Sequence, residues 1–294
     1  MAQKNYKPHY EHLKNKWTEQ HLELQHSLWK RHRKSLRWFA NRSKHLTASA
    51  LSGLLLLASP ISASISAPIT TADQKPEFTD LDKDTFLVSD LYTVLPKEVR
   101  PLQQEEEQRV ISLLSARFGI PVKSEIDGKR LERNYGLIGA EQHLMRYPGD
   151  TIYSHFESEE DARIHTSSGM APGRGAWGYF ASSREVMTEE DIQRERYYIA
   201  VQTFLAPEFN SKVAEYRDFF KYRKMLLVNP YTGKSIVTVI GDAGPAVWTG
   251  KRLGGSPEVM QYLGRVDGSL KGPVLFFFID DPENKVPLGP MHVL

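Results

Sequence analysis

The sequence predicts a mainly β C-terminal domain with accessory helices, which we expect to close into a small β-barrel. Residues 222–228 end in an apolar run, residues 234–240 are rich in β-branched side chains, and the intervening segment 229–233 is typical of a turn, so together they predict a hairpin. Residues 197–204 are also rich in β-formers. Residues 273–279 form an almost wholly apolar run, typical of a strand buried on both faces.

The first 45 residues form a basic tail. They contain 11 Lys and Arg against 3 Asp and Glu, a net +8 in a chain whose total is +2, so the remainder carries −6. Trp17, Trp29 and Trp38 stand among the basic residues. This pattern suits contact with anionic lipid headgroups or with nucleic-acid phosphates. We favour a solvated cytoplasmic tail that sets membrane topology, and we expect no nucleic-acid partner.

Residues 46–68 are predicted to contact the membrane, because no charged residue occurs between residues 46 and 72. The stretch is long enough for a spanning helix, and the small residues at 62–67 suit signal-peptide cleavage. Both interpretations, supported by the one-sided basic flank, place the body outside the cytoplasm in the cell envelope, anchored or secreted. The alternative is a buried core helix. The chain has no cysteine, which excludes disulfides and thiolate ligands.

The rest of the chain divides into a proline-containing linker at 69–100, a small helical subdomain at 101–150 and a barrel domain at 151–285. Residues 102–118 predict a helix that Gly119 ends, because acidic residues fill its first turn and apolar residues line one face. Residues 141–150 suggest a short helix followed by a Pro-Gly turn. The sequence leaves open whether residues 101–195 complete the first strands of the barrel or form a separate unit.

Two further short helices carry capping signals. Thr188 with Asp191 predicts a capped start for a helix that ends near residue 196. Ser256 followed by Pro257 predicts an N-cap and a proline in the first helical position. Both helices flank predicted strands of the barrel domain.

Residues 228–245 comprise an asparagine, a turn that ends in Gly-Lys-Ser, an alternating strand and then Asp242-Ala243-Gly244-Pro245. A short helix ending in Leu-Gly and a closing strand follow at 256–274. This order resembles the double-psi β-barrel domain of the rare lipoprotein A family over about residues 195–282. The resemblance implies a six-stranded double-psi β-barrel that binds or cleaves peptidoglycan or a related surface glycan.

The resemblance also implies that Asp242 is the catalytic acid of a lytic transglycosylase. Trp248, and Trp177 and Tyr179 from the glycine-rich stretch 167–180, are candidates to bind the substrate, with Val247 and Trp248 expected to shield the acid. His155 is a further substrate-binding candidate. Nothing in the sequence predicts a cofactor or a metal site.

Plainer interpretations stand beside these. Asp242 suits a turn, Trp248 suits core packing, and His143, His155 and His165 suit satisfied polar contacts. The chain departs from the family at Ala243, where arginine is usual, and at a histidine expected upstream of the hairpin. A non-catalytic glycan-binding module and an envelope assembly module that contacts a protein partner therefore remain as alternatives.

Overall fold

The computed structural model describes residues 79–265 and 271–294 of the chain. The basic tail at 1–45 and the apolar segment at 46–68 lie outside these residues, so the membrane contact expected there stays a prediction. Within the two described ranges, no helix has both the length and the apolar character needed to cross a bilayer.

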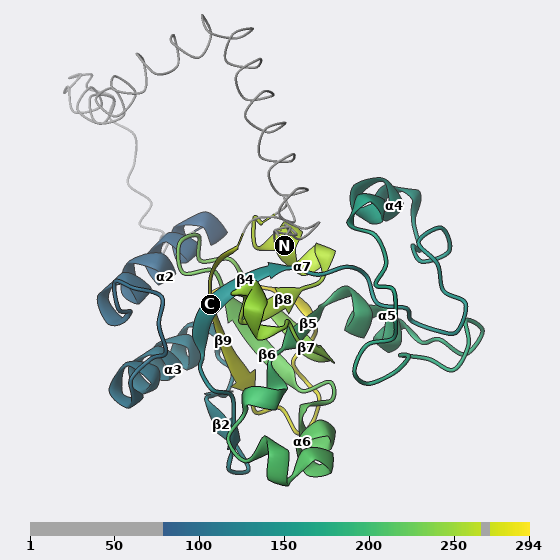
Figure 1. Ribbon diagram of the computed structural model, residues 1–294. Helices are drawn as coiled ribbons and strands as arrows, with labels where there is room; N and C mark the ends of the chain where they lie inside the picture. The colour runs from purple at the N-terminus through teal and green to yellow at the C-terminus, as the bar shows by residue number, and fades with distance from the viewer. Residues whose placement is uncertain (1–78, 266–270) are drawn as a thin grey trace, which may run out of the picture. The chain divides into compact units, whose positions relative to one another are not determined.

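Six strands close into a barrel (Figure 1). They are β4 (Tyr135–Ala140), β5 (Tyr198–Val201), β6 (Lys224–Val228), β7 (Ser235–Ala243), β8 (Leu253–Gly255) and β9 (Gly272–Ile279). Each strand pairs with two others of these six, in the circular order β4-β8-β5-β7-β6-β9. The β4–β8 and β5–β7 pairings are parallel, and the other four are antiparallel. The predicted barrel of six strands is thereby confirmed as a closed, mixed sheet.

The predicted hairpin forms between β6 and β7, with Val228 opposite Ser235. Asn229 organises its turn: the side-chain oxygen accepts from the Tyr231 backbone N–H at 3.0 Å, and the side-chain amide donates to the Leu263 carbonyl at 3.0 Å. Gly233 has φ +75°, and a Cβ there would lie 2.6 Å from a backbone oxygen. Glycine is therefore required at the end of this turn.

Apolar side chains pack on both sides of the barrel wall. Ile240, Phe276 and Phe278 belong to the interior cluster, whereas Val237 and Phe277 belong to a second cluster on the outside. The outer cluster is covered by the helices α2 (Asp80–Val94) and α3 (Gln104–Phe118) (Figure 1). Burial on both faces explains why strand β9 has no polar alternation.

The helices predicted from capping signals are confirmed. The α3 helix ends at Gly119, which has φ +64°. Thr188 and Asp191 form a capping box at the start of α5 (Glu189–Arg196). The Ser256 hydroxyl accepts from a backbone N–H in the first turn of α7 (Pro257–Tyr262).

The structure differs from the expected domain division. Helix α2 occupies part of the expected linker at 69–100, and Thr79 caps it. Strand β4 belongs to the barrel although it lies in the expected helical subdomain at 101–150. Gly136 and Gly139 weaken the strand signal of β4 in the sequence, and they leave room for side chains that cross the strand.

Residues 141–150 contain no helix and include a turn at 147–150, so the short helix expected there was wrong. The remaining strands and α-helices of the described residues are β1 (Val122–Lys123), β2 (Glu125–Ile126), β3 (Lys129–Arg130), α4 (Glu159–His165), α6 (Val213–Phe220) and β10 (Gly289–Met291). Residues 141–197 form a long excursion between β4 and β5 that carries α4 and α5 (Figure 1). This excursion supplies most of the candidate site residues.

Candidate functional site

Asp242 lies near the end of β7, where the chain leaves the barrel. Its Oδ1 accepts hydrogen bonds from the backbone N–H groups of Ala176 at 2.6 Å and Ala243 at 2.8 Å. The carboxyl is half-buried. Burial raises its pKa above the usual range, although the two N–H donors act in the opposite direction. Asp242 is thus a carboxyl at the barrel rim whose protonated form is favoured by its surroundings.

The glycine-rich stretch covers this carboxyl. A Cβ on Gly175 would lie 3.2 Å from Leu144 Cδ1 and 3.4 Å from the Gly241 carbonyl oxygen, so the backbone passes the rim at a distance that suits glycine. Trp177 packs against the interior cluster and donates its indole N–H to the Ile240 carbonyl at 3.0 Å. The stretch is therefore hydrogen-bonded to strand β7 through Ala176 and Trp177.

The two predicted aromatic partners from this stretch differ from Trp248 in exposure. Trp177 and Tyr179 are half-buried, and the Arg174 guanidinium lies 5.7 Å from the Tyr179 ring centroid. Trp248 is 88% exposed in a short 3₁₀ turn after β7, and Val247 is 52% exposed. Because both side chains are exposed, they do not provide the shielding of Asp242 that was expected from them. The glycine-rich stretch covers Asp242 instead. Trp248 instead presents its ring to solvent.

His155 lies inside the protein, with only 3% of its surface exposed. Its Nδ1 is 2.8 Å from Asp150 Oδ2 and its Nε2 is 3.0 Å from Glu195 Oε2. Burial lowers the pKa of His155, but hydrogen bonds to the two carboxylates outweigh it and raise the pKa to about 9. The plain interpretation of His155 as a satisfied polar contact describes this geometry. A glycan can reach the ring only if the covering chain moves.

His143 is buried beside His155 and Glu195, with no exposed surface. Its ring centroid lies 4.7 Å from that of His155, and its Nδ1 is 3.5 Å from Glu195 Oε1. Neither ring nitrogen has a hydrogen-bond partner among the residues that the structure describes. His143 therefore differs from the satisfied polar contact expected for it.

Two more ionisable side chains border these residues. The His165 ring centroid lies 6.2 Å from that of His143, and burial lowers the pKa of His165. Burial, followed by repulsion from Glu195, raises the pKa of Glu258 to about 7. Sequence reasoning did not single out Asp150, Glu195 or Glu258. The one available signal was their position at a Pro-Gly turn and in two capped helices.

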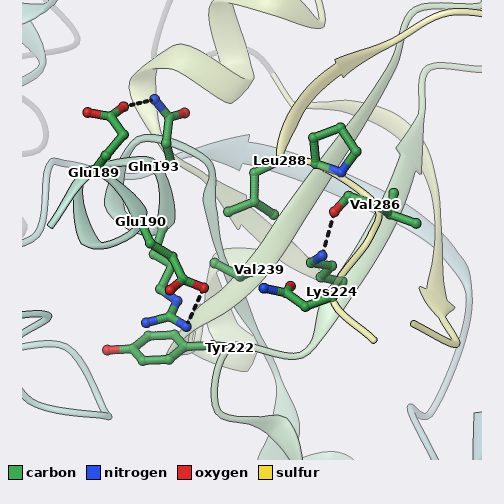
Figure 2. A pocket seen from close by; sticks show the side chains of 11 residues that line it. Glu189, Glu190, Gln193, Tyr222, Lys224, Val239, Val286 and Leu288 are labelled. Atoms are coloured by element: carbon green, nitrogen blue, oxygen red, sulfur yellow. Dashed lines mark hydrogen bonds and ion pairs between the residues drawn. The ribbon is translucent and has the colours of Figure 1, made fainter. Parts of the chain in front are cut away.

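A surface pocket of about 310 Å³ opens between α5, the β6–β7 sheet and residues 284–288 (Figure 2). Its charged groups already have partners: Glu190 binds Arg194 at 2.8 Å, and Lys224 binds Asp281 at 2.7 Å and the Val286 carbonyl. Tyr222 forms part of the lining. None of the site residues predicted from the sequence lines this pocket.

The fold and these sites define a closed, six-stranded mixed β-barrel with a half-buried carboxyl at its rim and a buried histidine–carboxylate cluster beside it. Burial raises the pKa of the rim carboxyl. The cluster holds nitrogen and oxygen atoms suited to hydrogen bonding or to metal coordination. No known family model matches the chain, and no curated protein matches it.

Proposed function

We propose that the protein binds peptidoglycan or a related surface glycan at the barrel rim, and that Asp242 is the acid that cleaves it. The observation that supports this most is the half-buried Asp242 carboxyl, whose pKa is raised by burial and whose Oδ1 is fixed by two backbone N–H groups. A fixed Oδ1 leaves Oδ2 to carry and donate a proton. The strand pairing is compatible with the double-psi barrel of the rare lipoprotein A family.

The proposed reaction needs one carboxyl group and no water. Protonated Asp242 donates its proton to the glycosidic oxygen while the bond from that oxygen to the anomeric carbon breaks. The 6-hydroxyl of the same sugar attacks the anomeric carbon, and the carboxylate accepts the hydroxyl proton. The products are a shortened chain and an anhydro sugar, and the acid returns to its starting form. Ordinary glycosidases need two carboxyls because they activate a water or form a covalent intermediate.

Trp248 is the proposed platform for the sugar. An exposed indole gives a large apolar face with a polar N–H, and tryptophan is enriched at binding interfaces. Trp177 positions the covering stretch through its hydrogen bond to the barrel rather than stacking on the glycan. The proposed location in the cell envelope rests on the uncharged segment at 46–68 and its basic flank.

The test is a digest of purified sacculi by the full-length protein, with release of anhydro-muropeptides measured by mass spectrometry. The proposal expects release by the wild type, loss of release in Asp242→Asn, and weaker sacculus binding in Trp248→Ala. Asp218→Asn is the matched control, because Asp218 is an exposed aspartate on α6. Sacculus binding without release in the wild type supports a binding module instead. If the wild type shows no binding and no release, the proposal is overturned and a protein-contacting module is favoured.

A further inference from the structure

We propose that His143, His155 and Glu195 form a binding site for one divalent transition-metal ion of the Zn²⁺ class. The site lies inside the excursion between β4 and β5. It is independent of the glycan proposal, since neither its geometry nor its test involves Asp242.

The three side chains bring ligand atoms together from three separate segments. One atom from each, two imidazole nitrogens and a carboxylate oxygen, lie within 4.8 Å of one another, and all three residues are buried. Two of the separations are 3.5 Å, from His143 Nδ1 to Glu195 Oε1, and 3.0 Å, from His155 Nε2 to Glu195 Oε2. Zinc bonds of about 2.0–2.2 Å place neighbouring tetrahedral ligands roughly 3.3 Å apart. The two observed separations, which run to the two oxygens of the same carboxylate, are each close to this value.

His143 gives an independent reason to expect a ligand. A buried polar group without a partner is costly, and natural structures rarely leave one in this state. His143 has no exposed surface, and its Nδ1 and Nε2 both lack partners within the described part of the chain. Its Nδ1 faces Glu195 at a distance too long for a good hydrogen bond and suited to a shared metal ion.

The surroundings of the other two ligands match the way proteins orient metal-binding groups. A ligating histidine usually donates its second ring N–H to a carboxylate, which fixes the ring. The Nδ1 of His155 lies 2.8 Å from Asp150 Oδ2, and a metal ion would take the place of the hydrogen bond that joins Nε2 to Glu195 Oε2 at 3.0 Å. Glu195 Oε1 accepts the Leu144 backbone N–H at 3.0 Å, so this carboxylate is also held in place.

The ligand types select the metal. Imidazole and carboxylate suit Zn²⁺ better than the all-oxygen sites preferred by Ca²⁺ and Mg²⁺. Three protein ligands leave a fourth position for water or another donor. Such an ion would tie residues 143–155 to helix α5. His143 also exchanges backbone hydrogen bonds with Gly169 and Ala171, so the ion would help to hold the glycine-rich stretch.

The experiment must separate this site from the basic tail, which contains six of the ten histidines. A full-length background variant with those six histidines changed to glutamine removes the competing ligands. After dialysis against Zn²⁺, we expect this variant to retain one zinc per chain by elemental analysis. Its melting temperature should also rise when Zn²⁺ is added, because an ion that binds only the folded state stabilises it. No retained zinc and no rise would overturn the proposal.

His143→Gln and Glu195→Gln in the same background should each lose the bound zinc. His292→Gln is the matched control, because His292 is an exposed histidine outside the cluster, and it should keep one zinc. Circular dichroism shows whether each variant is folded. Cluster variants that fold and still bind one zinc ion per chain would overturn the assignment. If both cluster variants fail to fold, the His292→Gln protein decides the question, through its zinc content and its absorption spectrum with Co²⁺. Retained zinc and intense d–d bands support the site. Absence of the bands refutes it.

Discussion

The backbone N–H of Ala176 donates a hydrogen bond of 2.6 Å to Asp242 Oδ1, although the two residues are 66 positions apart in the chain. This contact joins the long excursion after β4 to the rim of the barrel at the end of β7. The excursion therefore sets the environment of Asp242, and changes in either partner should affect the other.

Gly241→Ala should destabilise the barrel. A Cβ at this position would lie 2.6 Å from the Cβ of the fully buried Tyr198, so the strands must separate. Overpacking of this kind costs about 1–3 kcal/mol, measured as the free energy of unfolding in urea. Gly173→Ala is the control, since nothing lies within 4 Å of its Cβ and its φ is not positive. Equal stability of the two variants would contradict the close approach at Gly241.

Asp242→Asn should change how stability depends on pH. Burial raises the folded-state pKa of Asp242, so its contribution to stability is fully present below the unfolded-state pKa and is lost as pH rises through the folded-state pKa. The amide has no charge to bury. The unfolding free energy of the variant relative to wild type should therefore rise with pH across this acid window and then level off. Urea titrations over that range give the measurement, with Asp218→Asn, at an exposed aspartate, as the control. A falling difference would show that the pKa is lowered.

Lys224→Met should destabilise the fold far more than Lys212→Met. Lys224 pairs with Asp281 at 2.7 Å with both side chains largely buried, whereas the Lys212–Glu208 pair is exposed. Removing one member of a buried pair costs on the order of 3 kcal/mol, and exposed pairs contribute little. Thermal or urea unfolding compares the two variants. Similar losses would mean that water reaches the Lys224 pair.

The Lys224 pair should also weaken in acid. Burial acts to raise the pKa of Asp281, but its bonds to Lys224 and to two backbone N–H groups outweigh that effect and lower the pKa. The resulting stability is present above the unfolded-state pKa and is lost as pH falls through the folded-state value. The difference in unfolding free energy between wild type and Lys224→Met should shrink as the solution is acidified. A constant difference would argue against the ion pair.

Thr188→Ala should weaken the start of helix α5. The Thr188 side chain accepts from the Asp191 backbone N–H, and the Asp191 carboxylate accepts from Thr188 in return. Loss of such a cap costs about 1 kcal/mol. Because α5 carries Glu195, amide exchange near the buried cluster should also become faster. Thr188→Ser keeps the cap and should behave as wild type in both measurements.

The features that the sequence predicted well depend on neighbours in the chain. The hairpin around Asn229, the glycine stop after α3 and the capped starts of α5 and α7 each follow from a few adjacent residues. Strand β4 was assigned to a helical subdomain because its two glycines interrupt the β pattern. Helix α2 carried a usable signal at Thr79 and Asp82, which form a capping box like that of α5.

The sequence by itself determined a β-rich domain with a hairpin, capped helices and an aspartate at the end of a strand. Only the tertiary structure decided that this aspartate lies beneath a glycine-rich stretch, and that His143, His155 and Glu195 meet inside the protein. Turns and caps are set by local backbone geometry, which a sequence pattern reports. Closure of the barrel and assembly of the cluster join residues dozens of positions apart, and their positions follow from packing of the whole domain.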